Sequence, residues 1–292
     1  MNVISIQSHV AYGHVGNSAA VFALQRLGIE VWPVHSVQFS NHTGYPDWQG
    51  EVFDPRQIAR ILDGLAARGA LARCDALLTG YIGDPALGAV ILDTFSRIRA
   101  ANPQALWTCD PVMGNKGKGL FVRAGVPGFM AEGALPAADI LTPNLFELEL
   151  LTGLKPRGLQ AVRDAAATLL ARGPKVVLVT SLDAENPNAE NPDAEGNQAG
   201  EMEMLAVAAE GAWRVASPRL PMAPNGAGDA VAALFLGFYL KTASVPEALA
   251  AAASAIFEVL QTTLDAGEEE LQLVAAQNRL EAPRRRFIAE RL

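Results

Sequence analysis

The sequence contains few cysteines, no long apolar run and no charged-then-apolar leader. Its 292 residues include only Cys74 and Cys109. Both lie in apolar, strand-like runs, where a free cysteine usually behaves as a small hydrophobic residue. Two such cysteines favour a reducing compartment, so we predict a cytoplasmic protein. No run reaches the length that spans a bilayer, and we expect no membrane partner.

Positive charge is also scarce. The chain carries 23 basic and 31 acidic side chains, which gives a net charge of −8. This balance argues against a nucleic-acid surface. The only tight basic cluster is "EAPRRRF" near the C-terminus, and three arginines are more typical of a solvated tail or a carboxylate partner.

Two common nucleotide-binding motifs are missing as well. No G-x-x-x-x-G-K-[ST] stretch occurs, and no G-x-G-x-x-G follows a strand. Their absence argues against a P-loop enzyme and against a dinucleotide-binding enzyme.

Strand-like and helix-like runs alternate along most of the chain. Predicted strands cover 2–7, 30–39, 74–81, 105–111, 138–144 and 175–182, and predicted helices cover 18–28, 55–69, 85–102, 144–153 and 159–173. Such alternation implies parallel strands, right-handed crossovers and helices on both faces of the sheet. We therefore predict a three-layer α/β/α sandwich, with ligands at the carboxyl ends of its strands.

Other segments depart from this alternation. Residues 183–200 are polar, repeat "AENP" and predict a mobile loop, whereas 202–217 predict a hairpin that turns at Glu210-Gly211. Pro33 indicates an edge strand or a bulge. An alanine-rich helix is expected from Pro246, and 271–277 form a last strand or helix. No interdomain linker is visible, so we predict a single domain over 1–292.

The stretch Gly226-Ala227-Gly228-Asp229 precedes a strongly apolar helix. Glycines let the backbone turn tightly and approach another group. A helix start leaves several N–H groups unpaired, and these attract phosphate. The alternative is a plain glycine-rich turn in which Asp229 caps the helix.

Polar residues also follow other predicted strands. Pro111 restricts Asp110 to an extended backbone, so its carboxylate is aimed from the carboxyl end of the sheet. Asn144 and Glu147 share one face of a helix start. A capping box, with Asn144 as N-cap and Glu147 at the third helical position, explains the same spacing.

Taken together, these residues suit phosphoryl transfer. Mg²⁺ prefers few carboxylates, several waters and phosphate oxygens. The reaction needs charge neutralisation and a group that accepts the proton of the attacking hydroxyl. Asp229 beside an anion-binding turn can accept that proton while the turn holds the transferred group.

Several motifs give the chain a family resemblance. They are "VISIQSHVAYGHVGNSAA", "VQFSNHTGY", "TGYIGD", "CDPVMG", "TPNLFELELLTG" and "GAGDAVAALFL". The chain resembles, nearly end to end, the pyridoxal kinases of the ribokinase superfamily, particularly the bacterial pyridoxal/pyridoxamine kinase type. "SHVAYGHVGN" and "SNHT" are specific for the pyridoxal branch, whereas the Gly-x-Gly-Asp and Asn-x-x-Glu motifs are specific only for the superfamily.

The resemblance implies a ribokinase-like fold with a small β lid or edge hairpin, paired as a homodimer. It also implies ATP-dependent phosphorylation of the 5′-hydroxyl of pyridoxal, pyridoxine or pyridoxamine, with Mg²⁺ and, as a further cofactor, a monovalent cation such as K⁺. Asp229 would be the base. The matching motifs assign Gly226, Ala227 and Gly228 to the anion hole; Ser8, His42, Thr43, Gly44 and Tyr81 to the vitamin; Asp110, Thr142, Glu147, Thr180, Arg219 and Leu220 to ATP; and Asp110 and Glu147 to the metal.

Two positions depart from the family pattern. Ala227 replaces the usual Thr or Val of the anion hole, and Thr180 stands where this type often has Lys. Two alternatives therefore stay open: a hydroxymethylpyrimidine kinase of the same fold, and a non-catalytic carrier of B6 vitamers. "SNHTGY" favours the pyridoxal kinase over the first of these.

Overall fold

The computed structural model describes residues 1–183 and 200–292. The predicted loop at 183–200 therefore lies outside the described residues, apart from its two ends.

Within the described part of the chain, ten strands form one mixed sheet in the order β12-β11-β10-β9-β8-β5-β4-β1-β2-β3. The parallel strands are β1 (Asn2–Val10), β2 (Glu30–Phe39), β4 (Ala76–Thr79), β5 (Leu106–Cys109), β8 (Ile140–Leu141) and β9 (Val176–Asp183). Antiparallel strands extend both edges: β3 (Gly50–Val52) on one side, and β10 (Glu201–Ala208), β11 (Gly211–Pro218) and β12 (Glu290–Arg291) on the other. The alternation in the sequence thus produced the parallel centre that we predicted.

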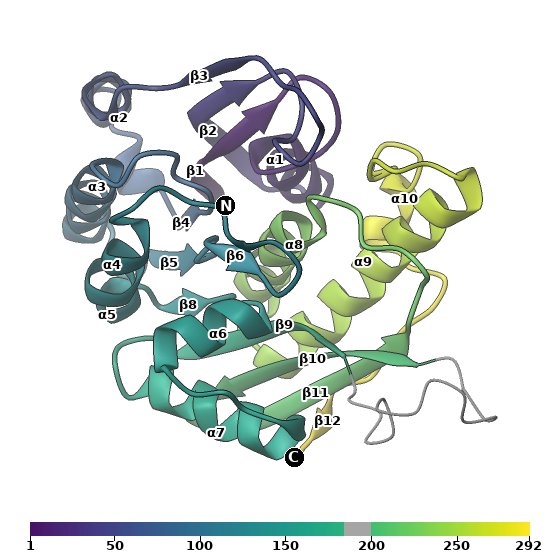
Figure 1. Cartoon of the computed structure of the whole chain (residues 1–292). Coiled ribbons are helices and arrows are strands. Elements are labelled where there is room, and N and C mark those ends of the chain that lie inside the picture. Colours follow the sequence, from purple (N-terminus) through teal and green to yellow (C-terminus); the bar gives the residue numbers. More distant parts are fainter. Residues whose placement is uncertain (184–199) are drawn as a thin grey trace.

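Helices cover both faces of this sheet (Figure 1). One layer contains α1 (Asn17–Arg26), α8 (Ala227–Thr242), α9 (Val245–Ala266) and α10 (Gln277–Glu281). The other contains α2 (Pro55–Ala67), α3 (Leu87–Ala101), α4 (Val126–Phe129), α5 (Leu135–Ala137), α6 (Leu145–Thr152) and α7 (Gly158–Leu170). Successive residues of β1 serve opposite layers, since Val3 packs with the first set and Ile4 with the second. The predicted three-layer sandwich is confirmed.

Some local predictions differ from the structure. The glycine-rich segment after β5, which the sequence suggests is a loop, contains a small hairpin, β6 (Gly114–Asn115) with β7 (Gly119–Leu120). The segment 271–277 is neither strand nor extended helix: it turns and leads into α10. Such short elements carry too few residues to show a hydrophobic period, so the sequence could not indicate them.

The expectation for Pro33 is confirmed. Strand β3 pairs only with Val37–Phe39, so the part of β2 that contains Pro33 has β1 on one side and no described strand on the other. A missing main-chain N–H is tolerated at such an edge.

The two cysteines and the helices also agree with the sequence. Cys74 and Cys109 are buried free thiols, and burial raises their pKa to about 11 and about 12 respectively. Neither thiol is therefore activated as a nucleophile. Among the helices of the described residues, none combines the length and the apolar character that crossing a membrane requires.

Candidate active site

Helix α8 begins at the predicted glycine turn, and no described side chain caps it. Its N-cap is Gly226, with φ of 86° in the left-handed region. A Cβ at Gly226 would run into the main-chain carbonyl of His14, so only glycine allows this close approach. The N–H groups of the first turn therefore stay available to an anion.

Asp229 lies in the first turn of α8 but is not its cap. No side chain, that of Asp229 included, makes a capping hydrogen bond at this helix start, so the capping interpretation of Asp229 is wrong. Desolvation raises the pKa of Asp229 to about 6, although the nearby main-chain N–H of Gly16, in the segment that follows β1, lowers it in part. A carboxylate with such a pKa remains basic near neutral pH and can accept a proton.

Ser8 is brought next to this carboxylate through Gly16. A side chain at Gly16 would collide with both the carbonyl and the hydroxyl of Ser8. Ser8 itself is almost fully buried near the carboxyl end of β1, where the pairing with β2 shifts by one residue. A predicted vitamin-binding residue and the predicted base thus approach the same main-chain segment.

Asp110 and Glu147 lie close enough to Asp229 for its charge to raise the pKa of both. Desolvation raises the pKa of Asp110 well above its usual value, and the charges of Glu147 and Asp229 raise it further. Desolvation also raises the pKa of Glu147 to about 7, against three main-chain hydrogen bonds that lower it. The two buried carboxylates, Asp110 and Glu147, therefore favour a cation beside them.

Glu147 and Asn144 form the predicted capping box of α6. Asn144 Oδ1 accepts from the Glu147 N–H at 3.0 Å, and Glu147 Oε2 accepts from the Asn144 N–H at 3.0 Å. The same residues also hold the β6–β7 hairpin: Glu147 Oε1 accepts from the Met113 N–H at 2.9 Å, and Asn144 Nδ2 donates to the Gly114 carbonyl at 2.9 Å. One pair of side chains therefore both caps α6 and holds the β6–β7 hairpin in place.

Two buried threonines complete this side of the site. The Thr142 hydroxyl lies beside Asp110 but makes no well-directed hydrogen bond within the described residues. The Thr180 N–H donates to the Pro143 carbonyl at 3.0 Å, which ties the carboxyl end of β9 to the start of α6. No group of three or more His, Cys, Asp or Glu suited to a metal occurs in residues 1–183 and 200–292. The donors present fit a cation that takes most of its ligands from phosphate and water, as Mg²⁺ does.

A narrow, mainly apolar cavity of about 80 Å³ opens beside the start of α8. Thioethers, aliphatic groups and an aromatic ring line it, and such walls suit a flat heterocycle. Its lining includes Thr180, Met204, Leu220, Ala227, Gly228, Val231 and Phe257. Leu220 and Thr180, which the resemblance assigns to ATP, thus line the same cavity. Arg219 is exposed on the adjoining segment, is not part of the lining, and donates its main-chain N–H to the Gly200 carbonyl at 2.8 Å.

The loop between β2 and β3 carries the remaining vitamin candidates. The Gly44 N–H donates to His42 Nδ1 at 2.9 Å, and Thr43 is exposed between them. Burial, then the nearby charge of Lys118, lowers the pKa of His42, so the tip of the β6–β7 hairpin reaches this loop. Tyr81 is half-buried against the small apolar cluster that contains Val37.

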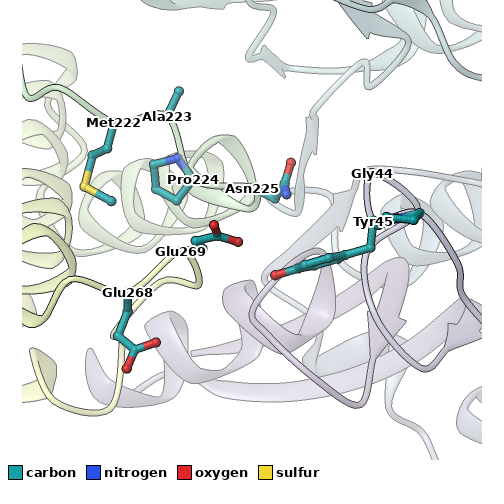
Figure 2. Close-up of a pocket in the computed structure, with 9 residues that line it drawn as sticks. Gly44, Tyr45, Met222, Ala223, Pro224, Asn225, Glu268 and Glu269 are labelled. Atoms are coloured by element: carbon teal, nitrogen blue, oxygen red, sulfur yellow. The ribbon is translucent and has the colours of Figure 1, made fainter.

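A second cavity, of about 380 Å³, separates this loop from the segment before α8 (Figure 2). Its lining consists of Gly44, Tyr45, Pro46, Met222, Ala223, Pro224, Asn225, Glu268 and Glu269. Tyr45 extends from its loop toward the segment that carries Glu269. The sequence contained no signal for this junction, because Tyr45 and its hydrogen-bond partner Glu270 are 225 positions apart.

This arrangement serves phosphoryl transfer from a nucleotide to an alcohol, on a fold of the ribokinase-like class. The sequence profile of the phosphomethylpyrimidine kinase family matches residues 52–273. The chain is 54% identical to pyridoxal kinase PdxY of Rubrobacter xylanophilus, over 100% of this chain and 98% of that protein. It is 51% identical to pyridoxal kinase PdxY of Deinococcus radiodurans, over 100% and 96%.

The fold agrees with a solved pyridoxal kinase as well. The structure of the Leishmania donovani enzyme in complex with ADP and pyridoxamine superposes with a TM-score of 0.89 at 28% identity, covering 100% of this chain and 99% of that one. The chain belongs to the phosphomethylpyrimidine kinase family, and within it to the PdxY-type pyridoxal kinases.

Proposed function

We propose that this protein transfers the γ-phosphoryl group of ATP to the 5′-hydroxyl of pyridoxal, and also to that of pyridoxamine and pyridoxine. One observation carries the proposal: Asp229, whose pKa is raised to about 6, stands at an uncapped helix start in a chain that is 54% identical to a pyridoxal kinase. The complex of the Leishmania donovani enzyme with ADP and pyridoxamine supports the pairing of these two substrates.

In this proposal Asp229 accepts the proton of the vitamin hydroxyl as that oxygen attacks phosphorus in line, without a phosphoenzyme. The main-chain N–H groups of residues 226–228 bind the transferred group. Ala227 in place of Thr or Val removes one hydroxyl contact but leaves these N–H groups. Vitamin contacts fall to Ser8, His42, Thr43, Gly44 and Tyr81.

ATP would place its base in the apolar cavity beside Thr180 and Leu220, with Arg219 flanking it. Asp110 and Glu147, with Thr142, would hold Mg²⁺ and with it the phosphates. The metal, when bound, neutralises the charge of the phosphate oxygens. The same buried oxygens provide a place for a monovalent cation such as K⁺, and a K⁺ dependence of activity would support it.

Three broader statements belong to the same proposal. Residues 1–292 form one kinase domain, which is supported by a single sheet whose strands extend from Asn2 to Arg291. The protein is cytoplasmic, which two buried free thiols support. It assembles as a homodimer, as its resemblance to pyridoxal kinases implies, and sedimentation equilibrium should then return twice the mass of the chain.

The decisive experiment is a coupled ADP-release assay with pyridoxal, pyridoxamine and hydroxymethylpyrimidine. We expect turnover with the two B6 vitamers. The family description favours one alternative, a hydroxymethylpyrimidine kinase, which would turn over only the third compound. Tight pyridoxal binding without any turnover would instead identify a carrier, and the substituted positions Ala227 and Thr180 would then be examined first.

A further inference from the structure

A buried carboxylate outside the proposed catalytic machinery joins three distant segments of the chain. Glu270 follows α9 and is only 8% exposed. Its Oε1 accepts the Tyr45 hydroxyl at 2.7 Å, and its Oε2 accepts the His14 N–H at 3.3 Å. Each carboxylate oxygen therefore fastens a different loop to the segment after α9.

Both loops that Glu270 fastens belong to the active site. The segment around His14 places the Gly16 N–H near Asp229, and the His14 carbonyl lies against Gly226, at the start of the helix that carries Asp229. The loop that contains Tyr45 also carries the vitamin candidates at 42–44. Glu270 thus contacts both the segment next to the proposed base and the loop proposed to bind the vitamin.

The chemistry of this junction favours a fixed contact. The two groups that donate to Glu270, the Tyr45 hydroxyl and the His14 N–H, are neutral. Breaking either hydrogen bond would leave an oxygen of this buried carboxyl group unsatisfied, which costs free energy. The hydrogen bond from Tyr45 to Glu270 raises the pKa of Tyr45 to about 12, which keeps that hydroxyl a donor at every working pH. Gly13, with φ of 86°, lies directly against the carboxylate, and a Cβ there would collide with it.

We infer that Glu270 is a positioning residue: by latching the Tyr45 loop to the His14 segment, it aligns the alcohol to be phosphorylated with Asp229. The Tyr45–Glu270 contact spans one side of the larger cavity, where Tyr45 reaches across to the segment of Glu268 and Glu269 (Figure 2). The inference rests on the proposed function for the identity of the alcohol, but not for the latch itself.

The test compares Glu270→Gln and Tyr45→Phe with Asp265→Asn. The control removes a negative charge from an exposed side chain near the end of α9 that lines neither of the two cavities and hydrogen bonds to neither loop in the described residues. A displacement of about 1 Å can cost roughly 100-fold in rate. We therefore expect kcat/KM for pyridoxal to fall about 10- to 100-fold in Glu270→Gln, less in Tyr45→Phe, and not in the control, with KM for ATP within about twofold of wild type.

The split between kcat and KM distinguishes positioning from a general loss of structure. When the His14 segment and the Tyr45 loop loosen, the alcohol is less often aligned with Asp229, whereas the lining of the apolar cavity proposed for ATP contains no residue of either loop. In Glu270→Gln, kcat for pyridoxal should therefore fall while KM for ATP stays within about twofold of wild type. Tyr45→Phe should add little in the Glu270→Gln background, because both changes break the same contact.

Hydrogen exchange measures the latch without any substrate. Residues 11–16 and 41–49 should exchange faster in both latch variants than in wild type and in Asp265→Asn. Unchanged exchange in these two segments, or wild-type kcat and KM for pyridoxal in both latch variants, would overturn the inference. If Glu270→Gln does not fold, Tyr45→Phe, which removes a single oxygen, decides the question alone. A wild-type protein that turns over no vitamer would refute the proposed function but leave the exchange result decisive for the latch.

Discussion

Three carboxyl groups, those of Asp110, Glu147 and Asp229, lie together at the carboxyl ends of the strands. Desolvation raises the pKa of all three, and the charge of Asp229 raises the pKa of the other two further. Without a bound cation this cluster opposes folding at neutral pH, because the ionised forms are buried and repel one another. In the proposed complex with Mg²⁺ and ATP, Asp110 and Glu147 would become metal ligands. The pKa values of these three carboxyl groups therefore bear on both activity and stability.

Asp229→Asn should reduce kcat by roughly two to four orders of magnitude, the range for loss of a general base, with vitamin binding largely kept. In the wild type, kcat/KM should rise with pH through about 6 and then level off, since the carboxylate must be ionised to accept a proton. Steady-state rates between pH 5 and 8 check both statements. A variant that keeps wild-type turnover would place the base elsewhere.

Asp110→Asn should stabilise the ligand-free protein as pH rises. The folded pKa of Asp110 lies above its unfolded value, so the wild type loses stability as pH increases from about 4, the unfolded value, through the folded pKa. Asparagine cannot ionise and avoids this loss. Thermal unfolding at pH 4 and pH 8 should show a difference in Tm between variant and wild type that is larger at pH 8. A difference that shrinks toward pH 8 would contradict the assigned shift.

At the scale of elements, the helices α6 and α8 differ in how the N–H groups of their first turns are satisfied. Helix α6 satisfies its first N–H groups with the side chains of Asn144 and Glu147, and the same pair anchors the β6–β7 hairpin. Helix α8 begins at a glycine and leaves its first turn available for a ligand. The capped helix α6 thus holds the structure around the candidate site, whereas the uncapped helix α8 keeps main-chain N–H groups available to a ligand.

Gly226→Ala and Gly228→Ala should change stability in opposite directions. Alanine at Gly226 must adopt a left-handed backbone, which costs roughly 1–2 kcal/mol, and its Cβ would also meet the His14 carbonyl. Gly228 is helical, and a Cβ there would meet no described atom within 4 Å, so alanine should add about 0.5–1 kcal/mol. Urea unfolding measures both, and equal effects would contradict the helix-start geometry.

At the scale of the molecule, the apolar cavity that we propose for the nucleotide depends on parts that lie far apart in the sequence. Its lining comes from the end of β9, the β10–β11 hairpin, α8 and α9 (Figure 1). A nucleotide bound there would connect the antiparallel edge of the sheet to one helical layer. Binding should therefore stabilise the whole fold and not only the loops that contact the ligand.

Mg²⁺–ATP at 100 times its Kd should stabilise the protein by about 2.7 kcal/mol. For a protein of this size that corresponds to a rise in Tm of roughly 5–10 °C. A thermal-shift titration with and without Mg²⁺ measures the effect. ATP alone should give a smaller rise, since the carboxylates of Asp110 and Glu147 then repel its phosphates; an equal rise would argue against their role as metal ligands.

Much of the architecture could be predicted because it depends on local patterns. Apolar runs and helical periods alternate along the chain, and parallel pairing follows from that alternation. Proline and capping residues then mark a strand edge and a helix start, as Pro33 and the Asn144–Glu147 pair illustrate. The short β6–β7 hairpin, β12 and the helical turns at 126–137 were not predicted, because two to five residues cannot display a period.

The sequence by itself determined the α/β alternation, the turn at 226–229 and the motifs that identify the family, since each of these lies within a continuous stretch. Only the tertiary structure decided that Asp229 lies beside the segment of Gly16 instead of capping its own helix, and that Glu270 holds Tyr45 and His14 together. Hydrogen bonds between residues more than 200 positions apart leave no local pattern, because they form only when the packed sheet and helices bring those loops to one place.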